Sequence, residues 1–281
     1  MDPIIPKILQ VILILAIQIT VVIVYVVMAI QNRQYFKKYW KPGLFLAILL
    51  FFMVLPSSIF SLVYIDALVF SEEMRPAFLI GLAVGFFILI IRIGWHMILY
   101  FVAAAEWEQA GSTVFAMEQA QRGLPRREMI EAFSFGICAA VLTYAVFIPL
   151  GVQEGPIFAK FRDFFPAADS ASLLVTIPIV TLFVTAFAIS EELVFRGGIL
   201  GLVVRRTGEN RVIRYIAISA ISLLWALAHI PNTSVPEVKV VQVFIIGLIL
   251  AEIARRSCIQ SAIAAHIGLN LGSVGLTFVL I

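Results

Sequence analysis

The stretch that decides the fold is ASLLVTIPIVTLFVTAFAISEELVFRGGIL, residues 171–200. Its first 20 residues carry no charged side chain, which is enough apolar length for a helix that crosses a bilayer. The same apolar run then contains Glu191, Glu192 and Arg196, in ISEELVFRGG. Ionisable groups inside a membrane are costly and usually functional, so we expect a site in this helix.

The composition of the whole chain indicates an integral membrane protein. Hydrophobic residues make up 62% of the 281 residues, charged residues make up 13%, and the mean hydropathy is +1.05. The apolar runs do not alternate with polar residues, which argues against a transmembrane barrel. We therefore predict an all-α, polytopic membrane helical bundle of about eight spans, at residues 8–30, 43–64, 77–101, 129–151, 171–200, 213–230, 238–254 and 259–280.

The chain is predicted to form a single transmembrane domain, residues 1–281. Residues 8–170 supply the N-terminal helices, and residues 171–281 supply the helices that bear the motifs. No low-complexity tract, long linker or internal repeat indicates a second domain. The longest connection, residues 102–128, mixes apolar and polar residues as an amphipathic helix on the membrane surface does. The first span begins without a basic cluster and has no small-residue cleavage site, so we expect it to be retained.

Lysine and arginine residues are distributed unequally between the two sides of this predicted bundle. Thirteen follow spans one, three, five and seven, five lie on the opposite side, and Arg92 and Arg196 fall within spans. The positive-inside rule then places both termini outside the cytoplasm of a multi-pass protein of the cell membrane. The net charge of +3 follows from this topology and indicates no nucleic-acid partner.

Helix geometry assigns different roles to the two adjacent carboxylates. Neighbouring residues on a helix point about 100° apart, whereas Glu192 and Arg196 are four residues apart and share a face. We therefore predict that Glu192 and Arg196 neutralise each other, which lowers the cost of both charges in the membrane. Glu191 is left as the free carboxylate.

Two further polar pairs lie downstream in apolar segments. WALAH places Trp225 and His229 four residues apart, and HIGLN does the same for His266 and Asn270. Glu191 precedes Arg205 by 14 residues, His229 follows Arg214 by 15, and Asn270 follows Arg256 by 14. These intervals correspond to about 21 Å of helix, while His266 lies one turn closer to the basic edge. Three helices are thus expected to present polar groups near the middle of the bilayer.

Residues of these types, gathered at one depth, can hydrolyse a peptide bond. A carboxylate can deprotonate water, a histidine can orient that water or pass its proton to the leaving amine, and histidine and asparagine can stabilise an oxyanion. No covalent nucleophile is required, and no serine or cysteine lies in a nucleophile motif such as GxSxG.

The three segments together resemble a known family. EELVFR matches the EExxxR motif, WALAH the aromatic-xxx-His motif and HIGLN the HxxxN motif of the CPBP family, which includes type II CAAX prenyl endopeptidases and bacteriocin-processing or immunity proteases. The resemblance covers about residues 170–281 in the right order. It implies an intramembrane glutamate protease that needs no metal or other cofactor and acts on a membrane-associated peptide or protein.

The resemblance also implies a role for each matching residue. Glu191 is the base that activates water and His229 is its partner. His266 and Asn270 stabilise the oxyanion. The supporting residues are Glu192, Arg196 and Trp225, the last standing where phenylalanine is common in the family.

Other functions stay open at this point. One is a non-catalytic membrane adaptor or bacteriocin-immunity protein. Another is an ion-coupled transporter that uses Glu191 and Arg92 as a proton relay, although repeats and discontinuous helices are missing. A zinc protease with Glu191, His229 and His266 as ligands is less favoured than the metal-free route, because HExxH is absent.

Several of these residues also have simple structural interpretations. His229 can cap a helix end, and His266 and Asn270 can bond across helices. Arg92 and His96 share a face of the third span, where a counter-ion role toward Glu192 or Glu252 is favoured over binding of a substrate carboxylate. Cys138 and Cys258 have no metal-type spacing and are interpreted as packing residues.

Overall fold

A computed structural model describes residues 4–69, 75–110, 126–147, 149, 170–207, 210–229 and 235–280. Every regular element within these ranges is a helix, which confirms the predicted fold class. The elements are α1 (Ile4–Gln31), η1 (Arg33–Tyr35), α2 (Phe36–Val69), α3 (Arg75–Gln109), α4 (Arg126–Phe147), α6 (Ser170–Glu192), η4 (Leu193–Ile199), α7 (Leu200–Thr207), α8 (Arg211–Leu227), α9 (Pro236–Arg256) and α10 (Ile259–Leu280).

The expected spans can be compared with these elements one by one. α6, η4 and α7 follow each other without interruption, so the described residues form eight helical rods, and each rod overlaps one expected span. Three helical segments in the described part of the chain are long and apolar enough to cross a membrane, namely Arg33–Pro56, Arg126–Val146 and Ile177–Thr207. The protein is thus a helical membrane bundle, and the number of its helices that span the bilayer stays a prediction.

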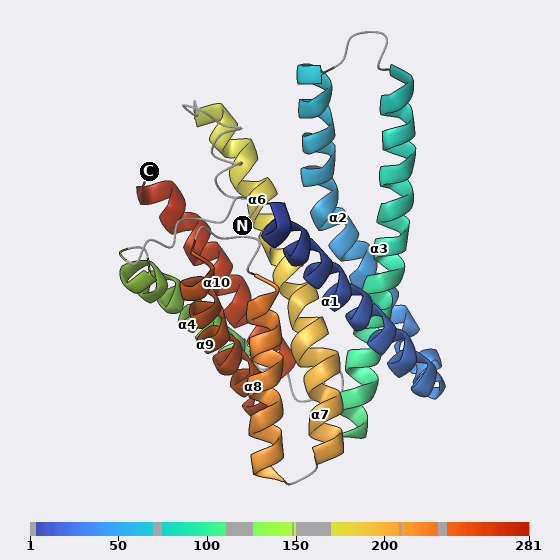
Figure 1. Ribbon diagram of the computed structural model, residues 1–281, viewed down its shortest axis with the longest axis vertical. Helices are drawn as coiled ribbons and strands as arrows, with labels where there is room; N and C mark the ends of the chain where they lie inside the picture. The colour runs from blue at the N-terminus through green and yellow to red at the C-terminus, as the bar shows by residue number, and fades with distance from the viewer. Residues whose placement is uncertain are drawn as a thin grey trace.

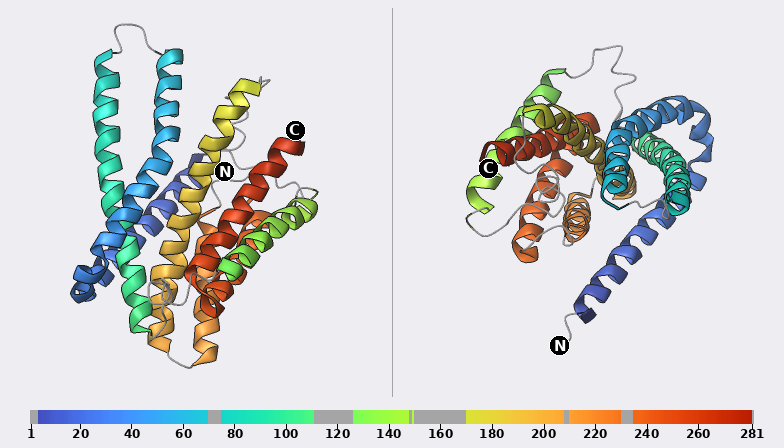
Figure 2. Two further views of the ribbon diagram at one scale, coloured as in Figure 1. Left: turned by 180° about the vertical axis from the view of Figure 1, so that it is seen from behind. Right: turned by 90° about the horizontal axis from the view of Figure 1, so that it is seen from above.

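The rod formed by α6, η4 and α7 lies in the middle of the bundle. α2 and α3 pack side by side on one side of it, and α8, α9 and α10 pack on the other (Figure 1). α4 packs along α10, and α1 crosses α3 and extends away from the rest of the bundle (Figure 2). The η4 segment contacts α3, α8, α9 and α10, so the EELVFR motif is at the place where the two halves of the bundle meet.

Glycines allow α10 to approach α4 closely. A Cβ atom at Gly268 would lie 2.2 Å from the carbonyl oxygen of Phe133, and one at Gly136 would lie 2.0 Å from that of Ala265. These distances leave no room for a side chain, so backbone packs directly on backbone. Small residues at helix contacts are typical of membrane bundles. This contact fixes the position of the helix that carries His266 and Asn270.

The segment 102–128, which was expected to form a helix on the membrane surface, begins inside the bundle instead. Residues 102–109 continue α3, and Val102 to Trp107 are buried in the bundle. The expectation fails for these residues because Glu106 and Trp107, which look like one polar and one interfacial residue in the sequence, both have partners inside the fold. Residues 111–125 of the expected surface helix lie outside the described residues.

A buried polar cluster joins Asn32, which follows the end of α1, to α3 and α7 at one end of the bundle. The Asn32 amide donates to Glu106 Oε1 at 2.6 Å, and Arg205 Nε lies 2.7 Å from Glu106 Oε2. Gln109 bonds both Asn32 and Arg205. Glu106 is completely buried, and the Arg205 guanidinium and the Asn32 amide compensate its charge. The cluster therefore ties the end of the motif helix to the N-terminal half of the chain.

Candidate functional site

The EELVFR motif contains a change of helix type. α6 ends at Glu192, and Leu193–Ile199 form the π-helical segment η4. π-helical turns are rare and are frequent at functional sites. Residues from two other helices hold this backbone: Tyr25 Oη donates to the carbonyl oxygen of Leu193 at 3.0 Å, and Trp107 Nε1 donates to that of Arg196 at 3.0 Å. α1 and α3 thus stabilise the π-helical geometry that follows the two carboxylates.

Glu192 and Arg196 form the ion pair that their spacing predicts. Arg196 NH1 lies 3.0 Å from Glu192 Oε1, and the side chains are 1% and 0% exposed. The guanidinium also donates to the carbonyl oxygen of Gly247 at 3.2 Å and lies 4.3 Å from the centre of the Trp225 ring. A buried guanidinium is stable only with such compensation. The pair is therefore a fixed part of the bundle interior.

Glu191 differs from its neighbour in both exposure and partners. Its side chain is 29% exposed, and its Oε2 accepts a hydrogen bond of 2.9 Å from Trp225 Nε1. The prediction of a carboxylate without a partner is therefore wrong, because Trp225 reaches it from α8. Its other oxygen, Oε1, has no hydrogen-bond partner among the residues that the structure describes. Glu191 thus keeps one oxygen available to a ligand.

His229 follows the C-terminal end of α8 and caps it. Its Nδ1 lies 2.9 Å from the carbonyl oxygen of Trp225, and its ring stands at 77° to the Trp225 ring, 5.0 Å away. A carbonyl oxygen only accepts, so Nδ1 carries the hydrogen and Nε2 of the neutral ring keeps its lone pair. His229 therefore caps the end of α8, and the same hydrogen bond leaves its Nε2 available as a proton acceptor.

His266 lies between the two carboxylates. Its Nδ1 is 2.9 Å from Glu192 Oε1, its Nε2 is 3.9 Å from Glu191 Oε2, and its ring centre is 5.5 Å from that of Trp225. The contact with Glu192 is a hydrogen bond, whereas the distance to Glu191 is too long for one. Since His266 is 4% exposed, these contacts fix the orientation of its ring.

Asn270 lies one helical turn beyond His266 and bonds to a different part of α6. Its Nδ2 donates a long hydrogen bond of 3.4 Å to the carbonyl oxygen of Val184. The structure thus brings Glu191, Trp225, His229 and His266 together, and it places Asn270 against the preceding turns of the same helix. One N–H of the Asn270 amide is left for another acceptor.

Arg92 and His96 contact neither Glu192 nor Glu252, the carboxylates that were expected to pair with them. The Arg92 guanidinium lies 5.2 Å from the centre of the Phe187 ring, and His96 Nε2 lies 2.8 Å from Ser190 Oγ. The expected counter-ion role is wrong, since Glu192 is paired with Arg196, and Glu252 with Arg255 and Arg256. Ser190 Oγ donates to the carbonyl of Ala186, so it accepts from His96. These contacts attach α3 to the helix turn that precedes Glu191.

The described residues contain no group of three or more His, Cys, Asp or Glu side chains that could hold a metal ion. Cys138 and Cys258 are free thiols. Cys258 is buried, as a packing residue should be, whereas Cys138 is exposed on α4, so the interpretation as a packing residue is wrong for Cys138. The site itself contains a partly exposed carboxylate, two oriented imidazoles and a buried ion pair.

Comparison with known proteins agrees with the motifs. Residues 172–272 match the family model described as type II CAAX prenyl endopeptidase Rce1-like. This range contains all three motifs and confirms the resemblance to the CPBP family. No curated protein and no solved structure matches the chain.

Proposed function

We propose that this protein, whose C-terminal segment is Rce1-like, is an intramembrane endopeptidase that hydrolyses a peptide bond in a membrane-associated peptide or protein. The observation that carries the proposal is the position of Glu191. Its carboxylate is partly exposed inside an apolar bundle, is held by Trp225 and lies 3.9 Å from an imidazole nitrogen. Keeping an accessible carboxylate in apolar surroundings costs free energy, so such a group usually has a function.

Glu191 and His229 activate the attacking water in this proposal. Trp225 holds Oε2 of Glu191, so Oε1 is free to accept a hydrogen from water. The neutral His229 ring offers its Nε2 lone pair as a second acceptor, because the Trp225 carbonyl fixes the hydrogen on Nδ1. The water oxygen attacks the carbonyl carbon of the scissile bond, and its proton passes through these groups to the departing amine nitrogen.

His266 and Asn270 stabilise the oxyanion of the tetrahedral intermediate. The bond to Glu192 orients the His266 ring, and Nε2, which lies 3.9 Å from Glu191 Oε2, is the ring nitrogen that we assign to the oxyanion. Asn270 contributes the amide hydrogen that Val184 does not use. Preorganised donors of this kind act strongly where water is excluded. Glu192, Arg196 and Trp225 support them by fixing the positions of His266 and Glu191.

The substrate in this proposal is bound to or embedded in the bilayer. The description of the matching family names a CAAX prenyl endopeptidase. The three motifs account for hydrolysis of the peptide bond, but they do not specify which lipid, if any, the substrate carries. We propose a multi-pass protein of the cell membrane with both termini outside the cytoplasm, and a reaction that involves no metal. Activity that persists after thorough chelation, with no stoichiometric zinc by elemental analysis, is the expected result.

The decisive experiment compares membrane peptides from cells that carry the native protein with those from cells that carry Glu191→Gln. Peptides that require the native protein identify both the activity and the substrate. Glu131→Gln is the matched control, because this carboxylate lies on the surface in an ion pair with Arg127. If the purified Glu191→Gln protein cleaves such a peptide at the native rate, the proposal is wrong.

A further inference from the structure

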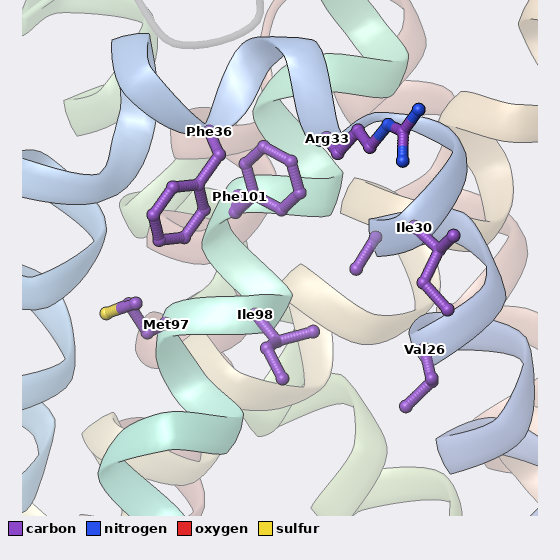
Figure 3. A pocket seen from close by; sticks show the side chains of 8 residues that line it. Val26, Ile30, Arg33, Phe36, Met97, Ile98 and Phe101 are labelled. Carbon is purple, nitrogen blue, oxygen red and sulfur yellow. The ribbon is translucent and has the colours of Figure 1, made fainter.

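An apolar groove lies between α1, the start of α2 and the end of α3, away from the candidate active site. Its volume is about 400 Å³, in the range of pockets that bind small molecules. α1 contributes Val26, Ala29 and Ile30, and α3 contributes Met97, Ile98 and Phe101. Figure 3 shows these side chains on the two facing helices, with Arg33 at one end. The groove is thus an apolar channel that ends at a cation.

The residues on α1 form one continuous face. Val26, Ala29 and Ile30 are spaced as neighbours on the surface of α1, and Arg33, the first residue of η1, follows just beyond the end of this helix. Tyr25 and Met28 belong to another face, which is buried in the bundle. The groove therefore does not result from poor packing of α1. It lies beside a well-packed contact.

The cationic end of the groove lies where a membrane surface is expected. Arg33 is followed within eight residues by Lys37, Trp40 and Lys41, and the Lys41 ammonium lies 5.8 Å from the centre of the Trp40 ring. Tryptophan and basic residues gather at the level of the lipid headgroups. From this level the groove extends along α1 into the apolar part of the bundle.

Arg33 is available for an external anion. Two nearby cations have carboxylate partners: Lys38 lies 2.8 Å from Glu108, and Arg205 lies 2.7 Å from Glu106. No carboxylate pairs with Arg33 in the described ranges of the chain. A free guanidinium beside an apolar channel at headgroup level is complementary to a phosphate group that carries an acyl chain.

We infer that the groove binds one anionic membrane phospholipid, with an acyl chain along α1 and α3 and the phosphate on Arg33. Basic pockets between membrane helices bind anionic headgroups in this way. Such a lipid would lie between α1 and α3 and would contact Val26, the residue that follows Tyr25, whose hydroxyl bonds to the π-helical segment. The inference does not depend on whether the protein cleaves peptides.

The test measures lipid retention by native mass spectrometry on delipidated protein, after addition of phosphatidylglycerol or phosphatidylcholine with identical acyl chains. The wild-type protein is expected to retain phosphatidylglycerol about fivefold more strongly, which corresponds to about one headgroup contact with a basic residue. Arg33→Gln should remove this preference. Arg211→Gln, at an exposed arginine on α8, should leave it unchanged.

A second pair of variants tests the acyl chain. Val26 and Val27 are 42% and 45% exposed, but only Val26 lines the groove. Val26→Trp should fill the groove and lower retention of both lipids, whereas Val27→Trp should retain them as the wild type does. Equal retention of the two lipids by the wild-type protein overturns the inference, as does an unchanged preference in Arg33→Gln. If Val26→Trp instead blocks only a peptide substrate, the groove belongs to that substrate and the lipid assignment is wrong.

Discussion

The indole of Trp225 donates to Glu191 Oε2 at 2.9 Å, while the face of the same ring lies 4.3 Å from the Arg196 guanidinium. One side chain thus touches both the candidate base and the buried ion pair. The ring stands edge to face with His229 and His266 as well. Trp225 is therefore the centre of the site, although its own chemistry is limited to one N–H donor.

The first prediction concerns this donor. Trp225→Phe keeps an aromatic ring between the imidazoles but removes the hydrogen bond to Glu191. A hydrogen bond to a charged group contributes about 1.5–3 kcal/mol, so we expect the rate of peptide cleavage to fall roughly 10- to 100-fold. The measurement is kcat on a substrate peptide in detergent or nanodiscs. Trp40→Phe, at an exposed tryptophan, is the control and should retain the wild-type rate.

The second prediction concerns the buried pair. Glu192→Gln leaves the Arg196 guanidinium buried without its counter-charge, and we expect a loss of about 3–5 kcal/mol in the free energy of unfolding. The double variant Glu192→Gln with Arg196→Met should lose less than the two single variants together, because no unpaired charge is left. Reversible unfolding in mixed detergent measures both. Additive losses would show that the two residues do not act as a pair.

The sequence predicts those parts of the site that depend on residues of one helix. The Glu192–Arg196 pair follows from four-residue spacing, and the spacing of Trp225 and His229 anticipates that they pack together. In both pairs the regular helix supplies the geometry. Depth in the membrane aligned Glu191 with His229 and Asn270 and placed His266 one turn closer to the basic edge. In the structure it is His266 whose Nε2 lies 3.9 Å from Glu191 Oε2, whereas Asn270 bonds to the carbonyl oxygen of Val184.

Contacts between helices could not be predicted in the same way, because spacing does not define which face meets which neighbour. The bonds from Trp225 to Glu191 and from Tyr25 to Leu193 join residues 34 and 168 positions apart. The π-helical segment leaves no clear mark in the residue types. The sequence did contain a sign of one such contact. A glycine inside a helical pattern often marks a place where another part of the chain packs closely, and at Gly198 a Cβ atom would lie 2.0 Å from Tyr25 Oη.

The third prediction tests this approach. Tyr25→Phe removes the hydroxyl that bonds to the π-helical backbone, and leaving buried carbonyl groups without that donor costs about 1–3 kcal/mol. We expect lower stability and also a lower cleavage rate, since η4 directly follows Glu191 and Glu192. The melting temperature and kcat are measured together. Tyr215→Phe, at a half-exposed tyrosine on α8, should change neither quantity.

The last prediction concerns the contact that positions α10. Gly268 lies between His266 and Asn270, and a Cβ atom there would lie 2.2 Å from the carbonyl oxygen of Phe133 on α4. Gly268→Ala must move one backbone away from the other, and overpacking of this kind costs about 1–3 kcal/mol. Gly275→Ala is the matched control, because no atom lies within 4 Å of its Cβ position and alanine favours helix. Both variants are compared by unfolding and by peptide cleavage. Since displacement of α10 moves His266 relative to Glu191, Gly268→Ala should lose activity even at temperatures where it is folded. If it cleaves like Gly275→Ala while folded, the close packing of α4 on α10 is not what positions the site.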